Sequence, residues 1–388
     1  MSTNLGSSNW NYPTSIWFGP GRVGDLANAA RDLGMEHPLL VTDRGLVGLQ
    51  PELQASEALR AAGLPFFTFS DFEGNPTGAD VMTGVEVFRQ GSHDGVIALG
   101  GGSALDVGKA IALMSGQQLQ LWDLEDVGDW WTRADPDGIA PIVAVPTTAG
   151  TGSEVGRCSV VVNQAQKRKV VIFHPAMLPG RVIADPGLTI GLPPGLTAAV
   201  GMDALSHNLE ALCAPGFHPM ADGIAVEGIC LIARSLVRAV RDGTDLEARA
   251  DLLVAATMGA TAFQKGLGAM HALSHPIGAH LGSHHGLTNA VVMPYVLSFN
   301  REAVTDRLAE VAQLLGKGRD FESFFAWVLE LRRELGIPNT LEPLGFLPEH
   351  AAELAPEALK DPTASTNPVE LTEMNLEGLY QSALSGTY

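Results

Sequence analysis

The chain has 388 residues, an apolar content typical of a globular protein and a formal net charge of −19. Its length exceeds what one hydrophobic core usually accommodates, so we expect two domains. The acidic balance argues against nucleic acid or an anionic membrane surface as a partner, because both require clustered Lys and Arg.

Three widely spaced cysteines, none in a Cys-x-x-Cys pair, indicate reduced thiols and no thiolate metal site. The N-terminal residues lack the features of a signal peptide, and no apolar run approaches membrane-spanning length. We therefore expect a cytoplasmic protein with a small-molecule substrate and no nucleic-acid or membrane partner.

The first half of the chain alternates short apolar runs with helical patterns. The predicted strands are 38–42, 64–70, 95–99 and 141–145, and the predicted helices are 51–62, 77–90 and 103–114. Valine-rich runs at 160–162 and 170–172 predict an added β-hairpin. Strands and helices in this alternation predict an α/β domain with a parallel sheet covered on both faces.

A segment rich in Pro and Gly, 185–195, precedes a half with helical periodicity. The helices predicted there are 196–212, 221–241, 246–264, 269–281 and 308–335. We therefore predict an α/β dinucleotide-binding domain over residues 1–188 and an all-helical metal-binding and catalytic domain over residues 189–388. A crevice between two domains is the usual place for a ligand.

The run GGGSALDVGK (100–109) follows a predicted strand and opens a helix. Glycines let a backbone approach phosphate closely, and a helix N-terminus supplies N–H donors. The run is neither GxGxxG nor a Walker A sequence, so an ordinary turn is the alternative. The predicted cofactor contacts in it are Gly100, Gly101, Gly102, Ser103 and Asp106. Asp106 and Lys109 stand three residues apart (i, i+3) on this helix. The alternative to a cofactor contact is that they simply form a surface ion pair.

The run PTTAGTGSE (146–154) also follows a predicted strand. We predict that Thr147, Thr148 and Thr151 bind phosphate, ribose or nicotinamide, with a plain polar loop as the alternative. Both runs lie at the carboxyl ends of strands, where open α/β sheets bind ligands. Asp43, at the end of the first strand, would accept hydrogen bonds from ribose and repel a 2′-phosphate, which favours NAD over NADP.

A metal site is predicted in the second half. Asp203 and His207 stand four residues apart in a predicted helix and share one face. Five of the eleven histidines fall between His271 and His285. One carboxylate and three imidazoles suit a divalent first-row metal, so we predict that Asp203, His207, His271 and His285 bind one ion. The alternative is a set of histidines that never meet.

His275 lies one helical turn from His271 and shares its face. It stands outside the predicted ligand set, and we predict that it helps relay a proton to solvent. A neutral core histidine is the alternative.

Together these segments resemble the iron-containing (group III) alcohol dehydrogenase family over nearly the whole chain. The motifs that carry the resemblance are NPT (75–77), GGGSALDVGK (100–109), PTTAGTGSE (146–154), ADPGLT (184–189), GMDALSHNLE (201–210) and HALSHPIG (271–278). The resemblance implies Fe(II), or alternatively Zn(II), on the four predicted ligands and NAD across the glycine loop. Segments 214–223 and 263–268 are most similar to the 4-hydroxybutyrate dehydrogenase-like branch. There Lys265 would counter a substrate carboxylate, with a surface lysine as the alternative.

The resemblance implies a metal-dependent, NAD-linked alcohol dehydrogenase or aldehyde reductase acting on short primary alcohols or ω-hydroxy acids such as 4-hydroxybutyrate. It also implies a homodimer or a larger homo-oligomer. A dehydroquinate synthase-like or sugar-phosphate metalloenzyme is the alternative, but it would need more Lys and Arg in the helical domain. A metal-dependent hydrolase would not need two nucleotide-type loops, and a noncatalytic nucleotide-binding protein would not need the metal site.

Overall fold

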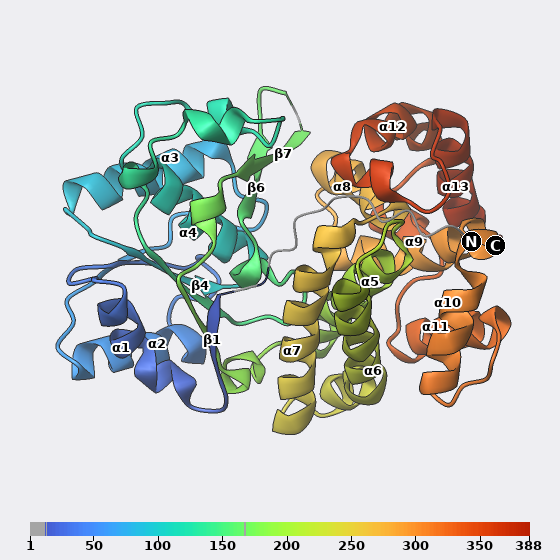
Figure 1. The fold of residues 1–388 in the computed structure, drawn as a ribbon, viewed down its shortest axis with the longest axis horizontal. Helices are drawn as coiled ribbons and strands as arrows, with labels where there is room; N and C mark the ends of the chain where they lie inside the picture. Colours follow the sequence, from blue (N-terminus) through green and yellow to red (C-terminus); the bar gives the residue numbers. More distant parts are fainter. Residues whose placement is uncertain (1–11, 13, 167) are drawn as a thin grey trace. The chain divides into compact units, whose positions relative to one another are not determined.

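The structure is a computed structural model that describes residues 12, 14–166 and 168–388. It divides into two compact units, an α/β unit over Tyr12–Gly191 and a helical unit over Leu192–Tyr388 (Figure 1). The division thus falls between Gly191 and Leu192, slightly beyond the predicted boundary after residue 188. The predicted fold class, an α/β domain followed by an all-helical one, is confirmed.

Six parallel strands form the sheet of the α/β unit, in the order β1-β8-β5-β4-β2-β3. Their bounds are β1 Ser15–Phe18, β2 Leu39–Val41, β3 Phe67–Phe69, β4 Val96–Gly100, β5 Ile142–Pro146 and β8 Arg181–Ala184. Every residue of β4 and β5 is buried, as expected for central strands that are covered on both faces. The sequence did not predict the short strands β1 and β8.

Helices lie on both faces of this sheet (Figure 1). They are α1 Leu26–Asp32, α2 Gln50–Ala61, α3 Gly78–Gln90 and α4 Gly102–Met114. Leu26 of α1 and Leu59 of α2 pack in one buried cluster with Ile97 of β4. On the opposite face Gly108 of α4 lies against Ala98 of β4.

The predicted β-hairpin is confirmed as a separate two-stranded sheet. Strands β6 (Cys158–Asn163) and β7 (Arg168–Phe173) pair antiparallel, with Val160 opposite Val171. Their inward residues alternate with partly exposed ones, as in a strand pair with one covered face.

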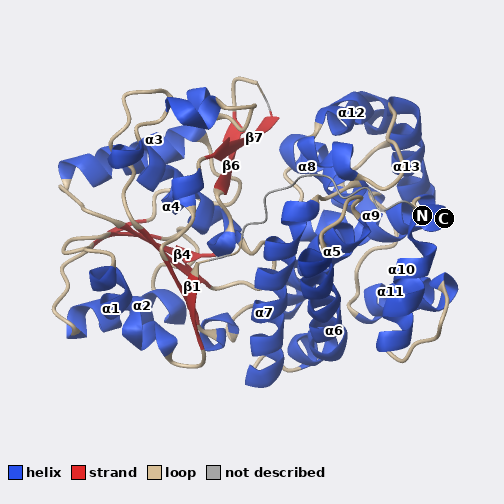
Figure 2. Cartoon of the chain, in the orientation of Figure 1, coloured by secondary structure: helices blue, strands red, loops and turns tan. Residues whose placement is uncertain are grey.

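Over Leu192–Tyr388, where every residue is described, the helical unit consists of helices and connecting turns without a strand (Figure 2). Its helices are α5 Pro194–Cys213, α6 Pro219–Arg241, α7 Leu246–Ala262, α8 Ala269–Leu281, α9 His285–Phe299, α10 Arg301–Leu314, α11 Phe321–Glu334, α12 Pro348–Lys360 and α13 Glu373–Ser385. Within the described ranges, no helix has the length and apolar composition needed to cross a membrane.

The single helix predicted over 308–335 is wrong, because two helices occupy this range. α10 ends at Leu314, and Gly316 and Gly318 then adopt φ values of 67° and 150°, which a right-handed helix does not allow. Asp320 begins α11 by accepting a hydrogen bond from the Ser323 N–H at 2.7 Å.

Gly108→Ala tests the close packing of α4 on the sheet. An added Cβ would lie 2.6 Å from the Cβ of Ala98, which sits on a buried strand and cannot move aside easily. We expect overpacking to lower the free energy of unfolding by about 1–3 kcal/mol, measured by urea denaturation.

The matched control is Gly223→Ala on α6, where an added Cβ meets nothing within 4 Å. We expect this change to be neutral or to stabilise by up to about 1 kcal/mol through helix propensity. Equal denaturation midpoints for Gly108→Ala and the wild type would contradict the packing argument.

Candidate functional site

Three helices of the helical unit bring the four predicted metal ligands together. Asp203 and His207 lie on α5, His271 lies on α8, and His285 is the first residue of α9. One ligand atom from each residue lies within 4.8 Å of the others. Asp203, His207 and His271 are buried, and the His285 side chain is 27% exposed. The alternative of histidines that never meet is therefore wrong.

The approach of α9 to α5 depends on Gly286. A Cβ at this position would lie 2.5 Å from the carbonyl oxygen of Ala199 and 2.9 Å from the Cβ of Asp203. Only glycine lets the first turn of α9 come this close. The Nε2 of His285 consequently lies 3.6 Å from Oδ1 of Asp203.

Glu210 of α5 holds His271 in a fixed orientation. Nδ1 of His271 donates to Oε2 of Glu210 at 2.6 Å, and both side chains are buried. This hydrogen bond places the proton on Nδ1 and leaves Nε2 to face the other ligands. Glu210 lies in the motif that contains Asp203 and His207, three residues after His207. The sequence analysis gave it no role, although its helical spacing puts it close to the same face.

The surroundings of His271 favour a positive charge. Burial by itself lowers the pKa of His271, but the carboxylates of Glu210, Asp203 and Asp361 outweigh it and raise the pKa above its ordinary value. Carboxylates that stabilise a positive charge on a buried imidazole would also stabilise a metal cation at the same site.

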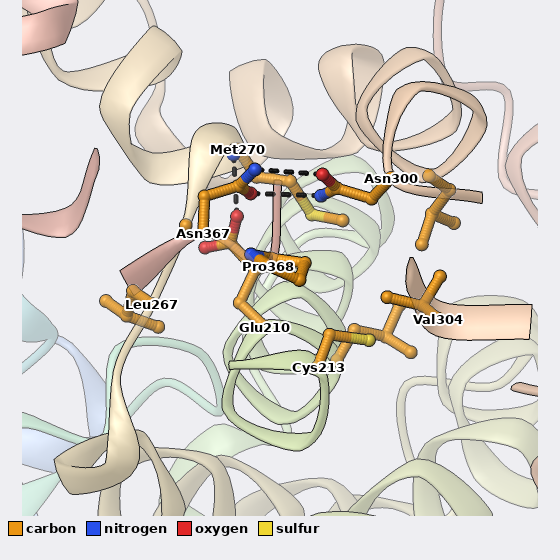
Figure 3. Close-up of a pocket in the computed structure, with 11 residues that line it drawn as sticks. Glu210, Cys213, Leu267, Met270, Asn300, Val304, Asn367 and Pro368 are labelled. Carbon is orange, nitrogen blue, oxygen red and sulfur yellow. Dashed lines mark hydrogen bonds between the residues drawn. The ribbon is translucent and has the colours of Figure 1, made fainter. Parts of the chain in front are cut away.

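The first turn of α8 is held by side chains rather than by an N-cap residue. Oε1 of Glu210 accepts from the Met270 N–H at 2.6 Å, and Oδ1 of Asn367 accepts from the Ala269 N–H at 3.1 Å. Asn367 and Asn300 exchange two further amide hydrogen bonds (Figure 3). Glu210, Met270, Asn300 and Asn367 border a cavity the size of a single water molecule. The carboxylate that orients His271 is thus itself anchored.

His275 lies next to the ligand set. Its ring stacks on that of His285, with centroids 5.2 Å apart and an interplanar angle of 14°. Nδ1 of His275 lies 2.7 Å from Oδ2 of Asp361, while Oδ1 of Asp361 accepts from the Thr363 N–H and hydroxyl. The His275 side chain is 24% exposed, so its ring is only partly enclosed. The proton relay and the alternative of a neutral core histidine both stay predictions. The sequence did not identify Asp361 as its partner.

Lys265 has a different environment from the one predicted. Its side chain is 2% exposed, so the alternative of a surface lysine is wrong. The ammonium pairs with Asp222 and donates to the carbonyl oxygen of Leu212, and Arg307 also pairs with Asp222 at 3.1 Å. Its charge is therefore matched inside the helical unit, and this geometry does not support the predicted contact with a substrate carboxylate.

The two predicted nucleotide loops lie side by side in the α/β unit. The Thr147 N–H donates to the carbonyl oxygen of Gly100 at 2.9 Å. A Cβ at Gly101 would lie 3.2 Å from Thr148, and one at Gly102 would lie 2.6 Å from the Thr151 hydroxyl. Both loops stand at the carboxyl edge of β4 and β5.

Asp43 and Ser103 border the same edge. Oδ2 of Asp43 would lie 3.3 Å from a Cβ at Gly100, where φ is 146° and glycine is required. Burial raises the pKa of Asp43, and backbone N–H groups oppose that rise in part. Ser103 is partly exposed in the first turn of α4. The predicted cofactor residues thus gather at one edge of the sheet, apart from Asp106.

Asp106 is a structural residue of this region. Its carboxylate accepts from the Ser153 hydroxyl at 2.5 Å and the Val160 N–H at 2.9 Å, and Lys109 lies 3.3 Å away. Lys109 is buried, so the alternative of a surface ion pair is wrong. Both carboxylate oxygens are engaged within the unit. We therefore assign Asp106 to holding the second loop on α4, in place of the predicted cofactor contact.

The donor set at the three helices fits a divalent ion. It offers one carboxylate and three imidazoles at short mutual distances, with a buried carboxylate behind one imidazole, as metal-binding histidines usually have. The chain combines an α/β unit that carries glycine- and threonine-rich loops with a helical unit that carries this four-ligand site. The combination defines the class of two-unit metal-dependent enzymes.

Family models narrow this class. Residues 13–186 match the model described as "Iron-containing alcohol dehydrogenase", and residues 197–384 match "Fe-containing alcohol dehydrogenase family, C-terminal". The chain belongs to the iron-containing alcohol dehydrogenase family, an oxidoreductase family, as the motifs predicted.

Individual relatives agree with this assignment. The chain is 38% identical to 4-hydroxybutyrate dehydrogenase of Cupriavidus necator, over 96% of this chain and 99% of the relative. It is similar to a crystal structure of 1,3-propanediol oxidoreductase, with a TM-score of 0.93 and 35% identity over 97% of this chain and all of that one. It is also similar to sulfoacetaldehyde reductase from Bifidobacterium kashiwanohense in complex with NAD+, with a TM-score of 0.87 and 30% identity over 98% and 100% of the two chains.

Glu210→Gln tests the hydrogen bond behind His271. A neutral amide would lose the charge that attracts the imidazole N–H, so we expect Zn(II) affinity to fall about 10- to 100-fold. Competition with a chelator of known affinity measures the change. The matched control is Glu52→Gln, a buried carboxylate of α2 that accepts from the Ser56 hydroxyl, and it should leave Zn(II) affinity unchanged. Equal affinities for Glu210→Gln and the wild type would refute the role of Glu210.

Proposed function

We propose that this protein is a metal-dependent, NAD-linked alcohol dehydrogenase and aldehyde reductase. The observation that carries the proposal is the convergence of Asp203, His207, His271 and His285 in a chain of this family. Family membership favours this function over the dehydroquinate synthase-like alternative.

Oxidation of an alcohol removes a proton from oxygen and a hydride from carbon. A divalent ion held by the four side chains, Fe(II) or alternatively Zn(II), would polarise the alcohol or aldehyde oxygen, and NAD would exchange the hydride. The protein would hold the ion on three helices and would orient His271 through Glu210. Its α/β unit would bind the nucleotide at the edge formed by Gly100, Thr148 and their neighbours.

His275 is the group we assign to proton transfer. Its Nδ1 is engaged by Asp361, so Nε2 is the ring nitrogen that would exchange the alcohol proton. Contact with the ring of His285 places it beside the ligand set, and its partial exposure connects it to water. Asp361 acts as a positioning residue that sets the orientation of this ring.

The proposed substrates are short primary alcohols and ω-hydroxy acids such as 4-hydroxybutyrate, with the matching aldehydes in the reverse direction. The names of the similar proteins support this range, since they include 4-hydroxybutyrate, 1,3-propanediol and sulfoacetaldehyde. A cytoplasmic location and assembly as a homodimer or larger homo-oligomer stay predictions from the sequence. Three free cysteines are consistent with that location.

The activity is tested by anaerobic absorbance kinetics of NADH formation and consumption after loading with Fe(II) or Zn(II). The panel contains 4-hydroxybutyrate, 1,3-propanediol, ethanol and 1-butanol, and the corresponding aldehydes. We expect turnover that disappears on chelation and returns with metal. The absence of coupling between any alcohol or aldehyde and NAD(H) would refute the proposed function.

His275→Ala tests the proton-transfer role. We expect kcat to fall about 100-fold with little change in metal content or KM, because a positioned acid–base group typically contributes at least that factor. Added imidazole should restore part of the rate, since the position is open to solvent. The matched control is His280→Ala. His280 lies on α8 like His275, and it pairs with Glu357 of α12. Full kcat in His275→Ala would contradict the assignment.

A further inference from the structure

The helix that carries His271 and His275 is interrupted by a proline. Pro276 lies in the interior of α8, directly after His275. Proline has no backbone N–H, so the carbonyl of Ala272, four residues earlier, loses the donor that an α-helix normally supplies. The proline ring also crowds this carbonyl. Backbone hydrogen bonds therefore hold the turn between the two histidines less firmly than they would in an uninterrupted helix.

A side chain from another helix supplies a hydrogen bond to the same turn. The hydroxyl of Tyr380 on α13 donates to the carbonyl oxygen of Leu273 at 2.8 Å, and Leu273 lies between His271 and His275. Tyr380 is fully buried, and its ring lies against that of Phe346, with centroids 5.0 Å apart. An enclosed ring has little freedom to move, so the hydroxyl holds this carbonyl at a fixed place.

Packing alone does not explain the hydroxyl of Tyr380. Phenylalanine would fill nearly the same space, and a buried hydroxyl loses its hydrogen bonds to water. The hydrogen bond to α8 offsets this loss. Burial raises the pKa of Tyr380 well above its ordinary value, and the carboxylates of Glu357 and Asp361 raise it further. The phenol therefore keeps its proton at neutral and moderately alkaline pH and remains a donor.

The first turn of α8 is anchored independently of Tyr380. The carboxylate of Glu210 accepts hydrogen bonds from both Nδ1 of His271 and the Met270 N–H. His271 is thus held ahead of the turn that the proline weakens. His275 follows that turn, so the position of its ring depends on where the backbone places it. The hydroxyl of Tyr380 therefore matters more for His275 than for His271.

We propose that Tyr380 is a positioning residue for His275. Its hydroxyl holds the turn of α8 in which Pro276 removes a backbone hydrogen bond, and the ring of His275 thereby stays beside that of His285. This inference rests on the proposed role of His275 in proton transfer.

Tyr380→Phe tests this role, because it removes only the hydroxyl oxygen. We expect kcat with NAD and the best alcohol of the panel to fall about tenfold, since a small displacement of a reacting group from its productive position lowers the rate steeply. KM and the affinity for Zn(II), measured by competition with a chelator, should keep their wild-type values, because Glu210 anchors His271. A merely structural role would lower the free energy of unfolding without this separation of kcat from KM and metal affinity.

The matched control is Tyr295→Phe. Tyr295 is also a buried tyrosine whose hydroxyl donates to a backbone carbonyl, that of Asn339, and it lies on α9, the helix that begins with His285. We expect this change to leave kcat, KM and Zn(II) affinity unchanged while it lowers the free energy of unfolding. The comparison separates the loss of a buried hydrogen bond from the displacement of His275. Circular dichroism establishes that each variant is folded at the assay temperature.

A second comparison places Tyr380→Phe on a Pro276→Ala background. Alanine restores the backbone N–H that can bond to the Ala272 carbonyl, so the turn depends less on the hydroxyl. We expect Tyr380→Phe to lower kcat by a smaller factor on this background than on the wild type. An equal loss on both backgrounds would show that the hydroxyl does not act through this turn, and it would overturn the proposal.

The remaining outcomes distinguish this inference from the proposed function. If the wild type is active and Tyr380→Phe keeps its full kcat, the positioning role is wrong and the proposed function stands. If kcat and Zn(II) affinity fall together, Tyr380 supports the whole centre and its particular role at His275 is wrong. If the wild type couples no alcohol or aldehyde to NAD(H), the proposed function is wrong and this inference falls with it.

Discussion

The hydrogen bond between the Glu210 carboxylate and Nδ1 of His271 determines what the centre of the helical unit can bind. It directs Nε2 of His271 towards Asp203 and His285, and it places negative charge directly behind an imidazole. The same carboxylate satisfies the Met270 N–H in the first turn of α8. The orientation of one ligand and the start of the helix that carries it therefore depend on a single side chain. Any movement of Glu210 would disturb both.

The sequence contained most of the information about the fold and about the ligand set. Alternating strand and helix patterns predicted the central strands and α2 to α4, because buried parallel strands are apolar throughout and helices follow them in turn. α2 and α3 each bury one face, whereas α4 is buried from Ala104 to Met114. Asp203 and His207 could be paired from their helical spacing. Partners that meet only through tertiary structure could not be paired in this way. Glu210 is 61 residues from His271 and Asp361 is 86 residues from His275, and no local periodicity connects such positions.

The wrong or incomplete predictions have related physical causes. The helix over 308–335 was predicted from apolar periodicity, which continues across Gly316 and Gly318 although their backbone conformations end it. Lys265 and Asp106 carry charges that a linear sequence suggests are available for ligands. In the folded chain Lys265 pairs with Asp222. Asp106 pairs with Lys109 and accepts hydrogen bonds from the Ser153 hydroxyl and the Val160 N–H. Whether a charged side chain faces a ligand or a neighbour is decided by packing, which local patterns do not describe.

The distribution of the ligands along the chain has a consequence for how the helical unit holds together. Asp203 and His207 lie on α5, whereas His271 and His285 follow only after α6 and α7. An ion bound to all four would connect segments separated by loops of roughly 60–80 residues, and closing loops of this length removes substantial entropy from an unfolded chain. The ion would therefore act as a reversible cross-link as well as a reactive centre. The folded helical unit would then be more stable with the ion bound than without it, by an amount that depends on the metal concentration around it.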